Sequence, residues 1–125
     1  MSRDYSRLMF LSGAVFNTLA GLLLLLVAMG PAADIMGFEI TPTATLFIQV
    51  MGGVVLAFAW AYWKISTDPV LYRPYILLGL CLKIMVVVLV FGHWLAGNIL
   101  WPFPALVSGD ILYAFLFWRY YQLKS

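Results

Sequence analysis

Residues 74–97 read PYILLGLCLKIMVVVLVFGHWLAG, a long apolar run whose one charged side chain is Lys83. A helix rises about 1.5 Å per residue, so roughly 20 apolar residues span the hydrocarbon core of a bilayer. A run of this length without polar alternation is typical of a transmembrane helix. We therefore expect the segment to cross the membrane.

Other apolar runs of this kind occur at residues 8–29, 43–63 and 103–118. Thr41-Pro42 has the chemistry of a helix start, whereas Asp68-Pro69 and Arg73-Pro74 interrupt the chain between runs. The sequence therefore predicts an all-α polytopic membrane protein. We expect a single domain over residues 1–125, a bundle of four transmembrane helices.

The composition agrees with this class, since 65% of the residues are hydrophobic and only 10% are charged. Soluble globular domains carry about 25% charged residues. The few basic residues lie almost entirely between the apolar runs, so nucleic acid is not an expected partner and membrane lipid is. The single cysteine, Cys81, lies inside a run, which excludes an intrachain disulfide.

The loops predict the orientation. In a four-span arrangement the acidic Asp34 and Glu39 fall on one side. The basic residues that fall on the other side are Arg3, Arg7, Lys64, Arg73, Arg119 and Lys124. Because basic loops stay in the cytoplasm, we expect both termini there, in a bacterial inner (plasma) membrane. Tyrosines and tryptophans, Tyr62 among them, flank the runs as interfacial belts, and only Tyr113 is expected to lie deep.

Polar residues from three runs are expected at one depth. Measured from the basic ends, Asn17 and Lys83 lie about 15 Å into the membrane and Asp110 about 13.5 Å. A lone charge at mid-bilayer costs about 2.5–3.5 kcal/mol or more, so Lys83 and Asp110 should face inward and contact each other or water. Gln49 is expected one to two turns nearer the outside.

This polar cluster is the candidate ligand-binding site, and its residues are Asn17, Gln49, Lys83, Asp110 and Tyr113. Small residues flank several of them at helical spacing, which lets helices approach closely. One interpretation is a structural ion pair that fixes the helix register. The other is a functional site for a ligand or a proton, because ionisable groups inside membranes usually serve function.

A weak repeat relates the first and third runs. Arg7 and Arg73 are each followed by a glycine, Gly13 or Gly79, and then by a polar residue, Asn17 or Lys83. The two helical hairpins could therefore be parallel duplicates.

The sequence offers no catalytic residues, no metal ligands and no required cofactor. One histidine, His93, and one cysteine, Cys81, lie about three helical turns apart, too few and too far apart for a metal or haem site within the chain. Catalytic triads and phosphate-binding loops are absent from the sequence. We expect His93 to pack near the outer interface.

Four elements carry a family resemblance: Gln49 with Gly52-Gly53, Tyr62 before Asp68-Pro69, Arg73 through Gly79 to Lys83, and Gly109-Asp110 on an aromatic-rich last helix. With these the chain resembles an uncharacterised bacterial family of small four-helix membrane proteins, similar in outline to the DoxX-like group. Some DoxX-like proteins are quinone-linked oxidoreductase subunits. The resemblance implies a bundle with a polar interior, and the lack of a dithiol motif argues against thiol–quinone chemistry.

Two functions follow as hypotheses. The first is a non-catalytic membrane protein that binds an apolar small molecule, a quinone or a lipid, or serves as an accessory subunit of a membrane complex. The alternative is a small oligomeric transporter or proton-coupled carrier with Asp110 as the coupling group. Because one four-helix unit is small, we expect a homo-oligomer or a subunit of a larger complex. An enzyme is a third hypothesis.

Overall fold

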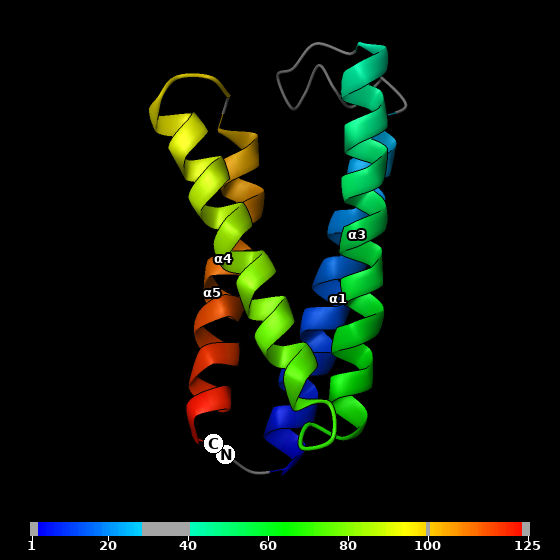
Figure 1. Ribbon diagram of the computed structural model, residues 1–125, viewed down its shortest axis with the longest axis vertical. Helices are drawn as coiled ribbons and strands as arrows, with labels where there is room; N and C mark the ends of the chain where they lie inside the picture. Colours follow the sequence, from blue (N-terminus) through cyan, green and yellow to red (C-terminus); the bar gives the residue numbers. More distant parts are fainter. Residues whose placement is uncertain (1–2, 29–40, 100, 124–125) are drawn as a thin grey trace.

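The computed structural model describes residues 3–28, 41–99 and 101–123, and these residues are almost entirely helical. The helices are α1 (Arg3–Ala28), α3 (Pro42–Thr67), α4 (Arg73–Leu95) and α5 (Pro102–Leu123) (Figure 1). The predicted all-α class is thus confirmed. The loop that carries Asp34 and Glu39 lies outside the described residues.

The helix starts follow the predicted chemistry. Thr41 caps α3, because its Oγ1 accepts a hydrogen bond from the Ala44 amide at 3.1 Å, and Pro42 occupies the first helical position. The helices α3 and α5 continue to Thr67 and Leu123, beyond the apolar runs that predicted them. These helix ends contain aromatic and basic residues. The helix propensities of such residues are sufficient for a helix to continue into the membrane interface.

Three of the helices are long and apolar enough to cross a membrane: Tyr5–Leu26, Pro42–Thr67 and Arg73–Leu95. The fourth helix, α5, is not among them. It is of similar length, but Ser108, Asp110 and Arg119 lower its apolar character. The described chain therefore has the character of a helical membrane protein with three candidate spans.

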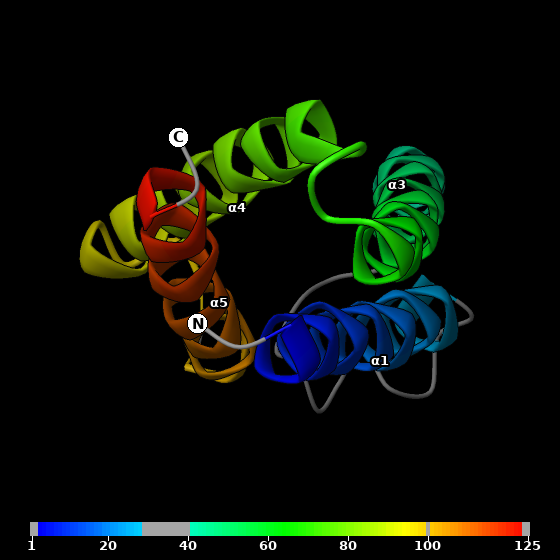
Figure 2. The same ribbon diagram turned by 90° about the horizontal axis from the view of Figure 1, so that it is seen from below.

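The helices form two antiparallel hairpins, α1–α3 and α4–α5. Seen from the end that carries both termini, they make a ring in which α1 lies opposite α4 and α3 lies opposite α5 (Figure 2). The hairpins meet near the termini and diverge toward the other end (Figure 1). The turn between α3 and α4 lies at the same end of the bundle, because α1 and α3 run in opposite directions (Figure 1).

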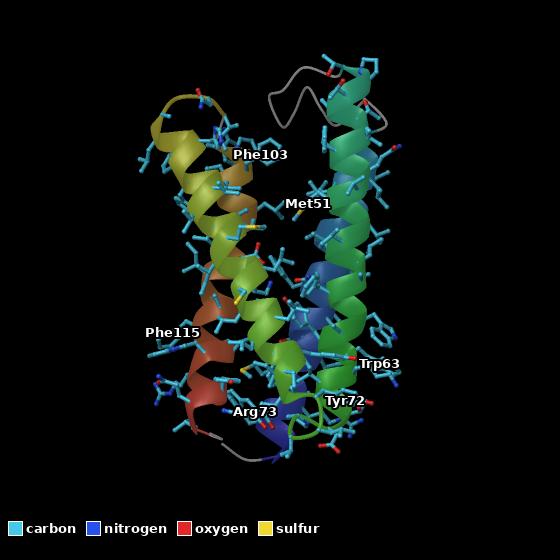
Figure 3. The ribbon with its side chains drawn as sticks, in the orientation of Figure 1. Met51, Trp63, Tyr72, Arg73, Phe103 and Phe115 are labelled. Atoms are coloured by element: carbon cyan, nitrogen blue, oxygen red, sulfur yellow. The ribbon has the colours of Figure 1, made fainter. Side chains whose placement is uncertain are left out.

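The hydrophobic core fills this terminal end. Phe10, Tyr62 and Phe117 are fully buried there, and the Phe117 ring lies 4.9 Å from that of Phe10 and 5.0 Å from that of Tyr62. Arg73 joins α4 to α5 beside this core, because its Nη2 donates to the Tyr121 carbonyl at 3.2 Å. Trp63 and Phe115 point outward on opposite sides of the bundle (Figure 3).

Glycines let α1 and α3 approach closely in the half of the bundle that is remote from the termini. A Cβ added at Gly21 would lie 2.8 Å from the Leu56 side chain and 3.1 Å from the Gly52 carbonyl oxygen. Only a residue without a side chain allows the two backbones to approach so closely. The α1–α3 hairpin is consequently the more extensively packed of the two.

Candidate functional site

An ion pair joins α4 to α5 inside the bundle. Lys83 Nζ lies 2.5 Å from Asp110 Oδ1, and the two side chains are 2% and 18% exposed. The contact predicted from the depths of the two residues is thus confirmed. A buried lysine needs such a partner, because an unpaired charge in a low-dielectric interior is strongly destabilising.

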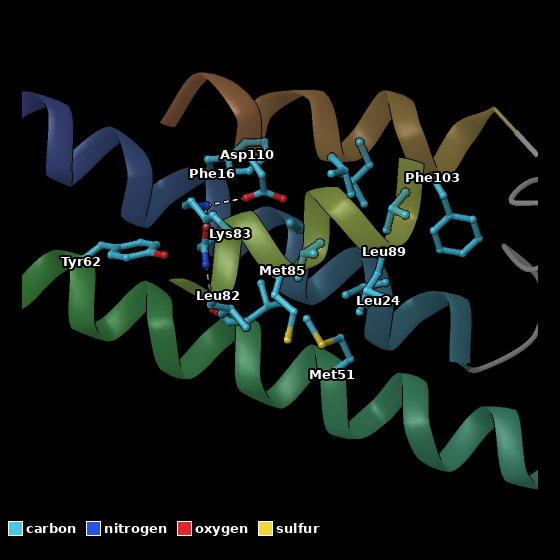
Figure 4. A pocket seen from close by; sticks show the side chains of 17 residues that line it. Phe16, Leu24, Met51, Tyr62, Leu82, Lys83, Met85, Leu89, Phe103 and Asp110 are labelled. Atoms are coloured by element: carbon cyan, nitrogen blue, oxygen red, sulfur yellow. Dashed lines mark hydrogen bonds and ion pairs between the residues drawn. The ribbon is translucent and has the colours of Figure 1, made fainter. Parts of the chain in front are cut away.

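Asn17 extends the pair to the other hairpin. Its Oδ1 accepts a hydrogen bond from Lys83 Nζ at 3.1 Å, and its Nδ2 donates to the Val55 carbonyl at 3.3 Å. Asn17, Lys83 and Asp110, called the polar cluster from here on, therefore link all four helices at one level through these contacts. The close-up view shows these contacts as a chain from Asp110 through Lys83 (Figure 4).

Aromatic rings surround the ammonium group of Lys83. Its Nζ lies 5.2–6.0 Å from four ring centroids, those of Phe16, Tyr62, Tyr113 and Phe117. Ring faces carry partial negative charge and attract a cation at such distances. They supplement the ion pair in holding the lysine charge inside the bundle.

Tyr62 has a buried hydroxyl without a hydrogen-bond partner in the described chain. Its side chain is 0% exposed, and the ring packs against Gly79, where an added Cβ would lie 2.6 Å from it. Leaving a buried polar group unpaired costs about 1–3 kcal/mol. Such a group at the edge of a cavity is a reason to expect a further hydrogen-bonding partner there.

A cavity of about 260 Å³ adjoins the polar cluster. Its walls come from all four helices and are mostly aliphatic; the polar side chains that line it are Asn17, Tyr62, Lys83 and Asp110. It runs from Tyr62 toward Phe103, away from the termini (Figure 4). Met51 of α3 and Phe103 of α5 line it on the side away from Tyr62, with Phe103 the further of the two (Figure 4). An apolar cavity with a few convergent polar groups is the usual form of a small-molecule site.

Two residues of the predicted cluster lie apart from this cavity. Gln49 is exposed on α3 and does not line it. Tyr113 is half-buried, and its hydroxyl donates to Ser12 Oγ at 3.0 Å, so only its ring belongs to the surroundings of Lys83. The structure therefore brings Asn17, Lys83 and Asp110 together and adds Tyr62, which the sequence analysis had assigned to an interfacial belt.

His93 lies near the end of α4 that is remote from the termini. Its Nδ1 is 3.0 Å from Asn98 Nδ2, and its side chain is exposed. Over residues 3–28, 41–99 and 101–123, no three His, Cys, Asp or Glu side chains lie together as a metal site would need.

The two hairpins repeat the same contacts around the cluster. Asn17 of α1 contacts α3 at Val55, and Lys83 of α4 contacts α5 at Asp110. Gly79 receives the ring of Tyr62 from α3. In the same way Gly13 of α1 lies against Phe117 of α5, where an added Cβ would be 3.1 Å from the ring. An approximate two-fold axis, which relates α1 to α4 and α3 to α5, therefore passes through the site.

The sequence contains a signal for this relation in α3 and α5. Residues 58–64 read FAWAYWK and residues 113–119 read YAFLFWR, so that Tyr62 aligns with Phe117, Trp63 with Trp118 and Lys64 with Arg119. Val55 and Asp110 align in the same register. This second repeat gives Tyr62 and Phe117 equivalent positions, which agrees with the full burial of both side chains.

Comparisons of the chain with protein-family models, curated proteins and solved structures found no match.

Proposed function

We propose that this protein binds one apolar small molecule of the membrane, a lipid or a quinone, in the cavity between its hairpins and catalyses no reaction. The observation that carries the proposal is the unpaired, fully buried hydroxyl of Tyr62 at the polar end of an otherwise apolar cavity. The cavity volume of about 260 Å³ is close to the lower end of the range for small-molecule sites, about 300–1,000 Å³.

In this proposal α5 crosses the membrane as a fourth span. It lies beside α4, and Asp110 is paired with Lys83, so this carboxylate would not face lipid. The basic end then lies in the cytoplasm of a bacterium, with both termini. Reporter fusions after Asp34 and after Asn98 should report the outside. Cytoplasmic reporter activity at either position would overturn the orientation.

A binding site accounts for the closed end of the cavity better than a transport path does. Phe10, Tyr62 and Phe117 fill the bundle between the polar cluster and the termini. A carrier needs access to its site from both sides of the membrane in turn. With an aromatic core at one end, the cavity extends from Tyr62 toward the other half of the bilayer.

The resemblance to the DoxX-like group fits a binder or an accessory subunit, and we propose it as the family relation. A partner protein that stays with the chain in mild detergent would favour the subunit role.

The test is extraction and mass spectrometry of what copurifies from native membranes. Ala20 lines the cavity, whereas Ala57 is exposed on α3. Ala20→Phe should fill the cavity and remove the bound compound, while the matched control Ala57→Phe should retain it at the wild-type ratio. Thermal unfolding checks that each variant folds. Equal amounts of compound in all three proteins, or none in any, would overturn the proposal.

A further inference from the structure

Among the residues that the structure describes, several hydrogen-bonding positions at the polar end of the cavity are left unused, and two of them differ in kind. The Tyr62 hydroxyl can donate a hydrogen bond. Asp110 uses Oδ1 for Lys83, and its other oxygen, which points away from Lys83, accepts no hydrogen bond from the residues that the structure describes (Figure 4). That carboxylate oxygen can only accept. Beside the remaining N–H groups of Lys83 and Asn17, the cavity therefore presents a donor at Tyr62 and an acceptor at Asp110 at its polar end.

From this pattern we infer that the occupant is an uncharged, hydroxyl-bearing amphiphile, such as a long-chain alcohol or a monoacylglycerol. This inference rests on the proposed function and deepens it. The hydroxyl hydrogen of the head donates to Asp110, and an oxygen of the head accepts from Tyr62. The apolar chain lies along the aliphatic wall toward Phe103.

The charge balance of the cluster excludes an ionised head. Lys83 and Asp110 neutralise each other, and Asn17 occupies a second donor of Lys83. A carboxylate head would place a second negative charge beside Asp110, and an ammonium head would compete with Lys83. Neither extra charge would find a counter-charge among the lining residues, and a buried, unpaired charge is strongly disfavoured.

The hydrogen-bond acceptor at Asp110 also excludes head groups that have acceptors but no hydrogen-bond donor. Ether and ester oxygens and quinone carbonyls have no hydrogen to donate. Such a head could pair with Tyr62 but would leave the acceptor at Asp110 unused. A head with a hydroxyl has a hydrogen to donate as well as an oxygen that accepts.

The walls suit a flexible chain. The residues beyond the polar cluster include Leu24, Met51, Val86 and Leu89, which are aliphatic or thioether side chains. Met side chains adapt to irregular ligands because they are unbranched and polarisable. The specificity of the site therefore lies at its polar end, while the chain end tolerates variation.

The experiment compares four ten-carbon compounds on delipidated, full-length protein in detergent: decan-1-ol, 1-methoxydecane, decanoate and decylammonium. Apparent dissociation constants come from dose-dependent thermal shifts. Decan-1-ol should bind about tenfold more tightly than its methyl ether, the factor that corresponds to about 1.4 kcal/mol. It should exceed both charged compounds by at least as much.

The variant Tyr62→Phe separates hydrogen bonding from packing. It should weaken decan-1-ol binding about tenfold. Binding of 1-methoxydecane should fall too, since its ether oxygen also accepts from Tyr62, and the preference for the alcohol should persist through Asp110. Tyr120→Phe is the matched control, because Tyr120 is buried in the core outside the cavity. It should leave both affinities unchanged.

The outcomes separate this inference from the proposed function. If alcohol and ether bind equally and Ala20→Phe abolishes both, the cavity is a binding site but the hydroxyl class is wrong. Tightest binding of decanoate or decylammonium would overturn the class as well. If no compound distinguishes wild type from Ala20→Phe, the cavity is not a binding site and both proposals fall.

Discussion

The two hairpins solve the same packing problem with different chemistry. In α1–α3 the polar position is Asn17, which donates to the backbone carbonyl of Val55. In α4–α5 the equivalent position is Lys83, which pairs with the carboxylate of Asp110. A neutral amide thus uses an acceptor that every residue provides, whereas a charged amine depends on one particular side chain.

The difference continues along the helices and accounts for the position of the cavity. Gly21 and Gly52 let the backbones of α1 and α3 approach closely. Their counterparts in the second hairpin are Val87 and Val107, and α4 and α5 are less extensively packed against each other. Val107 lines the cavity next to Asp110. The first hairpin is therefore a tightly packed support, and the second supplies the charged part of the site.

Removing one charge should produce the largest effect. Asp110→Leu leaves Lys83 buried without a counter-charge, so the free energy of unfolding should fall by about 3–5 kcal/mol. Lys83→Met should have a similar cost. The double variant should lose far less than the sum, because it removes both charges. Unfolding in detergent measures all three proteins, and simple additivity would show that the two residues do not interact.

Glycine substitutions should have the next largest effect and should differ between the hairpins. Gly79→Ala places a Cβ 2.6 Å from the fully buried Tyr62 ring, so overpacking should cost about 1–3 kcal/mol. At the equivalent Gly13 the ring of Phe117 is 3.1 Å away, and the cost should be smaller.

Gly92 is the matched control on the same helix as Gly79, since nothing lies within 4 Å of its added Cβ. Gly92→Ala should stabilise the protein by roughly 0.5–1 kcal/mol, because alanine favours a helix. If Gly79→Ala unfolded no more easily than Gly92→Ala, the Tyr62 contact would not exist as described.

Asn17→Leu tests whether the neutral hairpin depends less on its polar residue. The Lys83–Asp110 pair remains in this variant, so the loss should be about 0.6–1.7 kcal/mol, the range for hydrogen bonds between membrane helices. Thr18→Val is the control, because the Thr18 hydroxyl donates within its own helix to Ala14. It should change the unfolding free energy by less than about 0.5 kcal/mol. A cost for Asn17→Leu as large as that of Asp110→Leu would remove the contrast between the hairpins.

The depth of each polar residue could be predicted from the sequence, but the direction of its side chain could be predicted only for the charged pair. Helical rise from the basic ends placed Asn17, Lys83 and Asp110 at one level, and burial of charge then required the pair. The same reasoning says nothing about rotation around the helix axis. Gln49 was therefore included although it is exposed, and Tyr62 was assigned to the interface because Trp63 and Lys64 follow it. Packing against Gly79, which turns Tyr62 inward, is a property of the assembled bundle.

Gln49→Leu should have the smallest effect and is the sharpest test of that rotation. Gln49 is exposed on α3, and its counterpart in α5 is the buried Pro104, so the second hairpin has no polar group there. An exposed amide makes no contact with the cavity, and the unfolding free energy should change by less than about 0.5 kcal/mol. The copurified compound should stay at the wild-type ratio, while Asn17→Leu lowers it. Mass spectrometry of extracts from equal amounts of folded protein measures this.

Loss of the compound would place Gln49 in the site and contradict the helix rotation described for α3. If instead the compound stays and native mass spectrometry shows fewer associated copies, Gln49 faces a second copy of the chain, where an amide hydrogen bond between helices would account for a polar group on this face.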